Sequence, residues 1–364
     1  MGIPDETVTE ILHKVRSLDD WLVAWTWGAQ RFVGESRRLA ERGRERAAAE
    51  ARRQAAMCYH AAQFFTTDPR QLRVLRATAI SLFAQTMPAL TPALTRAEVS
   101  WRAWRLPGLL ARPAINGPVP LVVLLNGNSS AKEETILWAA AFLDAGLAVL
   151  ALDWPGTGEA AQTIPLTADC DDLADGLLDL ARANPDLDED RVALVGVGVG
   201  GALAVRAAAA DRRVAAVVAI TPPYDGDHWL GSASPLLREQ LAAALGGAAH
   251  LRAFVRDFAL PGVMPRLRTP LLVFGAGRDL VVPPDEAVRL AAASGALATL
   301  VWFPTAGHGL YDRLPSWTHD AATWLAIILR PTAASSPSTQ VDSAGIATSV
   351  PSVPRAMPLI SSFP

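Results

Sequence analysis

The chain has 364 residues, of which 51% are hydrophobic and 19% charged, a composition that predicts a globular protein with a sizeable core. Its 33 basic and 36 acidic residues nearly balance, so charge gives no indication of binding to nucleic acid or to an anionic membrane. The two cysteines, Cys58 and Cys170, lack the spacing of a thiolate metal site or a disulfide framework, and we expect buried free thiols. The first residues lack the apolar core of a secretory signal, so we expect a cytoplasmic protein.

Residues 1–96 are predicted to form a helical cap. Apolar side chains, among them Trp21 and Trp25, recur at helical spacing. Asp68 followed by Pro69 has the pattern of an N-cap with proline at the first helical position, which predicts a new helix there. The aromatic stripe of this region is explained by helix packing or by the wall of a substrate pocket, and both can hold for a cap.

Residues 97–330 are predicted to form an α/β core, because apolar runs typical of buried strands alternate with helical patterns. This alternation predicts a mostly parallel sheet with helices on both faces. The predicted strands are 99–105, 106–112, 118–125, 147–152, 192–195, 214–220, 271–274 and 299–303, and the predicted helices between them are 131–145, 170–183, 201–211, 285–294 and 316–329. An insertion at about 222–265, with helical patterns of its own, is expected to be a lid. The Ser-, Pro-, Ala- and Thr-rich residues 331–364 are predicted to be disordered.

A glycine-rich turn, Gly196-Val197-Gly198-Val199-Gly200-Gly201, joins a predicted strand to a predicted helix. It fits the dinucleotide-binding pattern G-x-G-x-x-G. It also fits the nucleophile elbow G-x-S-x-G of hydrolases, except that Gly198 stands where the serine would be. A dinucleotide fold usually carries this turn after its first strand, with an acid ending the next strand. Here two or more parallel strands precede the turn, and the next strand ends in Thr221 without an acid, so the elbow is favoured.

Polar residues follow the other strands of the predicted sheet, at the edge where open parallel sheets form their sites. The loop at 126–134 contains Asn128, Ser129 and the triplet Lys132-Glu133-Glu134, and the loop at 153–159 has the sequence D-W-P-G-T-G-E. Asp279 ends a G-x-G-x-D motif after the strand at 271–274, and His308 lies between two glycines after the last strand.

This order of motifs resembles the α/β-hydrolase superfamily, in which nucleophile, acid and histidine follow one another along the chain. Gly198, Asp279 and His308 hold those three places. The K-E-E triplet and the helical segment ahead of the core resemble the FrsA-like branch over roughly residues 10–330. That branch includes a C–C hydrolase acting on 2,6-dihydroxypseudooxynicotine and fungal hydrolases that shorten polyketide chains. The chain departs from the pattern at the nucleophile, since glycine offers no oxygen for an acyl intermediate.

The resemblance implies roles for the residues that remain. The backbone N–H groups of Asn128 and Val199 would form an oxyanion hole, Asp279 would orient His308, and His308 would act as a general base. Such a site suits proton abstraction beside a carbonyl, followed by C–C bond formation, cyclisation or lyase chemistry. Hydrolysis by a water that His308 activates is the alternative, and a non-catalytic pseudo-hydrolase that only binds a ligand is another.

The expected substrate is a small polyketide-like or aromatic carbonyl compound of natural-product metabolism, handled without a cofactor or a metal. The residues expected to line its pocket are Ser129, Trp154, Tyr224, His228 and Trp229. Ser129 or Ser130 could replace the lost nucleophile, although a hydroxyl in that loop more often caps the following helix. Lys132 and Glu133 are expected to form a structural ion pair. The resemblance also implies a homodimer, and we expect neither nucleic acid nor a membrane as a partner.

Overall fold

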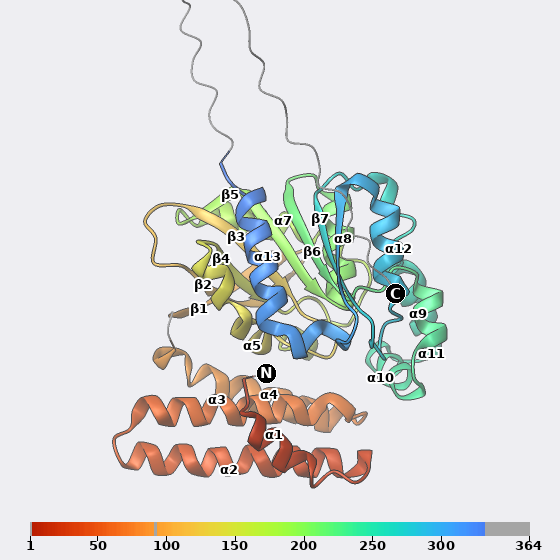
Figure 1. Cartoon of the computed structure of the whole chain (residues 1–364). Helices are drawn as coiled ribbons and strands as arrows, with labels where there is room; N and C mark the ends of the chain where they lie inside the picture. The colour runs from red at the N-terminus through yellow and green to blue at the C-terminus, as the bar shows by residue number, and fades with distance from the viewer. Residues whose placement is uncertain (1, 91–92, 332–364) are drawn as a thin grey trace, which may run out of the picture. The chain divides into compact units, whose positions relative to one another are not determined.

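An eight-stranded sheet forms the centre of the protein, in a computed structural model that describes residues 2–90 and 93–331 (Figure 1). The strand order is β1-β2-β4-β3-β5-β6-β7-β8. The strands are β1 (Leu94–Trp101), β2 (Trp104–Ala111), β3 (Val119–Leu125), β4 (Ala148–Leu152), β5 (Leu187–Val197), β6 (Val214–Ile220), β7 (Leu271–Ala276) and β8 (Ala298–Phe303). Strand β2 is antiparallel to β1 and β4, and all pairs from β4 to β8 are parallel. The expected α/β-hydrolase sheet is thus confirmed. The disorder predicted for residues 331–364 concerns a segment that, from residue 332 onward, lies outside the described residues.

Helices cover both faces of this sheet because successive side chains of a strand point to opposite sides. In β3, Leu121 and Val123 belong to one core cluster, and Val122 and Leu124 belong to the other. Helices α7 (Leu173–Ala183), α8 (Val199–Ala210) and α12 (Asp285–Ser294) pack on the first side, and α6 (Ala140–Asp144) and α13 (Leu314–Ile328) on the second. The buried strands are continuously apolar for this reason, as their sequence indicated.

The N-terminal region is helical, with α1 (Asp5–Leu12), α2 (Trp21–Glu41), α3 (Glu45–Ala62) and α4 (Pro69–Ala84). The predicted start of α4 is confirmed, since the Asp68 carboxylate accepts a hydrogen bond from the Arg70 amide at 2.9 Å. Trp21 and Trp25 pack against each other at 5.5 Å between ring centroids, and the Trp21 indole donates to the Ala61 carbonyl. The aromatic stripe of α2 therefore holds helices together.

Three short helices form the insertion between β6 and β7: α9 (Gly226–Ser232), α10 (Pro235–Leu245) and α11 (Ala248–Phe258). The helix predicted at 131–145 is instead divided into α5 (Lys132–Thr135), a 3₁₀ turn and α6. Both cysteines are buried and free as expected, and burial raises the pKa of each thiol to about 12. No helix in the described part of the chain is long and apolar enough to span a bilayer.

Candidate active site

The turn between β5 and α8 has the shape of a nucleophile elbow. Gly198 has φ +55° and ψ −123°, and α8 begins at the next residue, Val199. The neighbouring glycine, Gly196, allows strand and helix to touch, because a Cβ there would lie 2.1 Å from the Gly200 carbonyl oxygen. The repeated glycines of this stretch are thus explained by close backbone packing and by one left-handed residue.

Asp279 and His308, which lie far apart in the sequence, form a hydrogen-bonded pair beside this turn. His308 Nδ1 lies 2.8 Å from Asp279 Oδ2. The other carboxylate oxygen of Asp279 accepts the backbone N–H groups of Val281 and Val282 at 2.8 and 2.9 Å, which fixes its orientation. A carboxylate at Nδ1 holds the proton there and leaves Nε2 as the basic nitrogen.

The basic nitrogen of His308 faces the position that a nucleophile would occupy. A Cβ placed on Gly198 would lie 3.2 Å from His308 Nε2. The histidine side chain is 25% exposed, whereas that of Asp279 is 2% exposed, so the histidine is the solvent-accessible member of the pair. This geometry directs Nε2 of the candidate base at Gly198, which has no side chain, rather than at a serine hydroxyl.

Thr221, at the carboxyl end of β6, belongs to the same site, although it was not among the predicted site residues. Its Oγ1 lies 3.4 Å from His308 Nδ1 and accepts a hydrogen bond from the Gly309 amide at 3.1 Å. Thr221 is buried and has a positive φ of 44°, a conformation that β-branched residues rarely adopt. Backbone strain of this kind is often retained at functional sites, and here it supports the loop that carries the histidine.

Changing Gly198→Ser should create a Ser-His-Asp set. The positive φ makes any side chain unfavourable there by about 1–2 kcal/mol, and His308 must move by a few tenths of an ångström. We nevertheless expect a folded variant that hydrolyses p-nitrophenyl acetate with a burst of p-nitrophenolate, and we expect no burst from the parent protein. Gly198→Ala is the matched control, with the same strain and no burst. A folded Gly198→Ser protein without a burst would mean that His308 is not aligned with this position.

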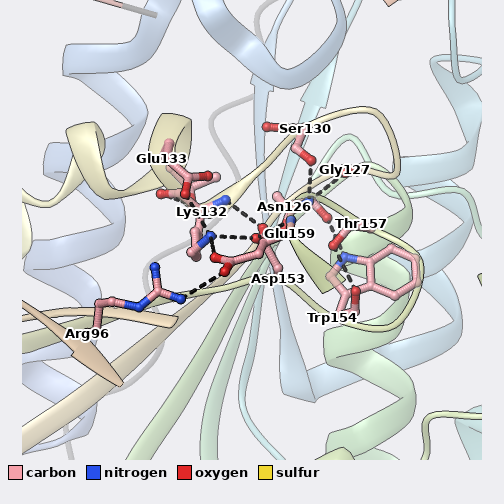
Figure 2. Close-up of polar contacts among 11 residues, drawn as sticks. Arg96, Asn126, Gly127, Ser130, Lys132, Glu133, Asp153, Trp154, Thr157 and Glu159 are labelled. Carbon is pink, nitrogen blue, oxygen red and sulfur yellow. Dashed lines mark hydrogen bonds and ion pairs between the residues drawn. The ribbon is translucent and has the colours of Figure 1, made fainter. Parts of the chain in front are cut away.

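The loop after β3 is held by hydrogen bonds from its own side chains and from the loop after β4 (Figure 2). The Asn126 amide donates to the carbonyls of Gly127 and Ser130 at 2.8 and 2.9 Å. The Trp154 indole donates to the Asn126 carbonyl at 2.8 Å. These bonds fix the backbone on either side of Asn128, whose N–H is a candidate donor to an oxyanion.

Lys132 lies at the centre of a buried charge cluster beneath this loop (Figure 2). Its Nζ contacts carboxylates of Glu133, Asp153 and Glu159 at 2.6, 3.0 and 2.7 Å, which confirms the expected pair with Glu133 and adds two further partners. Burial disfavours the charged amine, but the three carboxylates outweigh it and raise the pKa of Lys132 above its ordinary value. Arg96 reaches Glu159 from the partly exposed side, at 2.8 Å.

Asp153 connects the two loops through the same cluster. Its carboxylate accepts the backbone N–H of Lys132 at 2.7 Å and that of Glu159 at 2.8 Å. Burial raises the pKa of Glu133, and the nearby Asp153 carboxylate acts in the same direction. The K-E-E and D-x-P-G-x-G-E motifs therefore act as a scaffold for the candidate oxyanion loop.

A second buried pair joins the N-terminal helices to this loop. His60 Nε2 on α3 lies 3.1 Å from Glu134 Oε2, and both side chains are almost completely buried. Glu134 also contacts the Ser130 hydroxyl. Despite burial, which acts in the opposite direction, the bonds to His60 and Ser130 hold the pKa of Glu134 below its ordinary value. The sequence offered no signal for His60, since its partner is 74 residues away.

A cavity of about 250 Å³ lies beside the candidate oxyanion loop. Asn128 and Ser129 line it from the loop after β3, while α4, α10 and the residues after Gly156 supply the other walls. Of the expected pocket residues, only Ser129 is among its lining. Gly198 and His308 do not line this cavity, so it adjoins the elbow instead of enclosing it.

The remaining expected pocket residues lie in other surroundings. Trp154 is fully buried beneath the loop after β3. Trp229, Tyr224 and His228 lie around the loop of Asp279 and the start of α12: the Trp229 indole donates to the Val281 carbonyl at 3.0 Å, Glu286 accepts the Tyr224 amide at 2.6 Å, and His228 lies 3.2 Å from Asp285. These three residues thus pack around the loop that carries Asp279 and do not line the cavity.

A family model and the curated relatives of this chain agree on one family. The model of the family "Esterase FrsA-like" matches residues 5–305. 2,6-Dihydropseudooxynicotine hydrolase of Paenarthrobacter nicotinovorans is 29% identical over 219 residues, which is 60% of this chain and 59% of that protein. Hydrolase acrC of Aspergillus aculeatus is 32% identical over 232 residues, 56% of this chain and 54% of that protein. The chain thus spans little more than half the length of these curated relatives.

Solved structures agree on the fold. The crystal structure of the 2,6-dihydroxy-pseudo-oxynicotine hydrolase superposes with a TM-score of 0.80 at 23% identity, covering 90% of this chain and 94% of that one. Wild-type AbyA5 superposes with a TM-score of 0.70 at 19% identity, covering 89% of this chain and 94% of that one. The shared architecture includes the N-terminal helical region as well as the sheet.

Proposed function

The chain belongs to the esterase FrsA-like family of α/β-hydrolase fold, and on that premise we propose that it is a cofactor-independent enzyme without a nucleophilic serine. In this proposal His308, oriented by Asp279, removes a proton from the carbon beside a carbonyl group. The substrate is a small polyketide-like or aromatic carbonyl compound of natural-product metabolism. The product arises by C–C bond formation, cyclisation or elimination.

The observation that carries this proposal is the direction of His308. Its Nε2 is 3.2 Å from the place of a Cβ on Gly198, the carbon that would carry the nucleophilic hydroxyl in a serine enzyme. A base that faces no hydroxyl can accept a proton only from water or from the substrate. The absence of a side chain at Gly198 leaves room for a substrate carbon at that nitrogen.

The chemistry then needs no group beyond those of the chain. His308 Nε2 takes the proton, and the electron pair of the C–H bond moves to the carbonyl oxygen to form an enolate. The N–H groups of Val199, at the start of α8, and of Asn128 are the proposed donors to that oxygen, and each such donor typically contributes about 3 kcal/mol to the transition state. The enolate next expels a leaving group from the adjacent carbon or attacks an electrophilic carbon, and the imidazolium returns its proton.

Hydrolysis by a His308-activated water is the second candidate, favoured by the relatives that are named hydrolases. In that case the same oxyanion donors would stabilise a tetrahedral intermediate instead of an enolate. The two candidates use the same residues and differ in the atom from which His308 takes its proton.

Isotopes from the solvent separate the two candidates. Turnover of aryl ketones and β-diketone substrates would be followed in ¹⁸O-labelled water and in D₂O, with mass spectrometry of the products. Proton abstraction is expected to introduce deuterium at the carbon beside the carbonyl and no ¹⁸O. One ¹⁸O atom in the carboxylic acid product of each turnover would instead establish hydrolysis and contradict the first proposal.

A further inference from the structure

The cavity beside the candidate oxyanion loop has an unbalanced charge. Arg73 and Arg76, both on α4, are the charged residues among its lining, which contains neither aspartate nor glutamate. The remaining walls are apolar side chains and neutral polar groups such as Gln162 and Gln240. A cavity whose charged lining residues are all cations attracts anions, and its low-dielectric walls strengthen that attraction.

The two arginines reach the cavity because of helical spacing. Pro69, Leu72, Arg73 and Arg76 follow the i, i+3, i+4, i+7 pattern, so they occupy one face of α4, and all four line the cavity. The cavity therefore extends along a helix face, with the candidate oxyanion loop, represented by Asn128 and Ser129, on another of its walls.

Arg76 is held in place but is not neutralised. Its Nε donates to the Gln63 side-chain oxygen at 2.9 Å, and the Gln63 amide lies 2.7 Å from His60 Nδ1. No carboxylate within residues 2–90 and 93–331 comes within ion-pair distance of either cavity arginine. Burial lowers the pKa of Arg76, with Asp153 acting in the other direction, while Asp153 itself is paired with Lys132. Arg76 is thus a half-buried, oriented guanidinium whose terminal nitrogens have no counter-anion.

We propose that Arg76, assisted by Arg73, binds a delocalised oxyanion of the substrate, a carboxylate or an enolate, in this cavity. The inference rests on the proposed function, because it assigns the cavity to the substrate whose carbonyl lies at the elbow. A guanidinium with free terminal N–H groups suits two oxygens that share one negative charge. The volume of about 250 Å³ lies below the roughly 300–1,000 Å³ of drug-sized ligand sites, so the occupant is small.

Binding of two matched pairs of probes tests this site by isothermal titration calorimetry. The first pair is 3-benzoylpropanoate and its neutral amide, 3-benzoylpropanamide. The second is the enolate of 1,3-cyclohexanedione and its neutral methyl enol ether. The folded protein is expected to bind the anion of at least one pair about ten-fold more tightly than its neutral partner, and less so at high salt. The pair that shows the preference distinguishes a carboxylate from an enolate, and equal affinity in both pairs would overturn the proposal.

Substitutions on α4 test which arginine causes the preference for the anion. Arg76→Gln should reduce the ratio of affinities to within about two-fold, Arg76→Lys should retain part of it, and Arg73→Gln should have a smaller effect because that residue is exposed. Arg70→Gln is the matched control, since Arg70 is on the same helix but does not line the cavity, and it should keep the original ratio. An unchanged ratio in folded Arg76→Gln would overturn the proposal. If that variant does not fold, an unchanged ratio in Arg73→Gln overturns it.

The calorimetry does not depend on turnover, so it separates this inference from the proposed function. His308→Ala should keep the full preference for the anion. Full turnover in His308→Ala would reject the proposed function and leave the anion site standing. If the parent protein binds anion and neutral partner equally well, while its turnover requires His308, only the anion site is rejected.

Discussion

Replacing His308 by alanine is expected to lower kcat by about 10²–10⁴-fold, because the proposed reaction loses its only base. The loss should appear both in consumption of the carbonyl substrate and in deuterium uptake from D₂O at the carbon beside the carbonyl. Asp279→Asn should also be severely impaired, since an amide in place of the carboxylate at 2.8 Å no longer selects the tautomer with a basic Nε2.

His319 provides the control for this experiment. It lies on α13, is exposed, and has no part in the proposed chemistry, so His319→Ala should keep the parental kcat. Circular dichroism and thermal unfolding would establish that each variant is folded. Full activity in both His308→Ala and Asp279→Asn would reject a role for the pair.

Replacing Lys132 by methionine is expected to lower the free energy of unfolding by about 3–5 kcal/mol. The methionine fills similar space but leaves Glu133, Asp153 and Glu159 without their shared cation in a buried site. Urea unfolding followed by circular dichroism measures the change as a lower midpoint at a nearly unchanged slope.

Arg96→Met is the matched control for the charge cluster. It removes a cation from the same group of acids, but the Arg96 side chain is 47% exposed, so the expected loss is below about 1 kcal/mol. Equal losses of unfolding free energy in the two variants would show that the contribution of Lys132 does not depend on its burial. The prediction would then be wrong.

The mostly parallel sheet and the place of the elbow were predictable because their signals are local. Buried parallel strands are continuously apolar, and the loops at their carboxyl ends bring Gly198, Asp279 and His308 to one edge. Helix starts with a specific cap, such as that at Asp68, were also predictable. Strand β5 begins at Leu187, five residues before the predicted start, because the polar residues 188–191 extend the pairing beside β3 across an irregular register.

The long-range contacts of the site were not predictable from residue patterns. Thr221 reaches the histidine loop only through an unusual backbone angle. Lys132 was expected to pair with its neighbour Glu133, but its contacts with Asp153 and Glu159 arise from the packing of two loops. Trp154 follows a strand, as pocket residues often do, yet its indole is used to hold the Asn126 carbonyl. Such contacts depend on how distant segments of the chain pack against one another, and residue spacing along the sequence does not encode that packing.

The His60–Glu134 pair limits how the proposed substrate could enter the cavity. Moving α3 away from the loop after β3 would break this buried pair and expose the apolar side chains packed around it, at a free energy of about 3 kcal/mol or more. At that free energy, a state with the helical region lifted off would be populated below about 1%. Entry is therefore expected at the rim between α4 and α10, which both line the cavity. There α10 contacts the turn that precedes α4, since Gln240 donates to the Phe64 carbonyl. Local fraying of this rim would admit a small molecule while the other N-terminal helices remain in place.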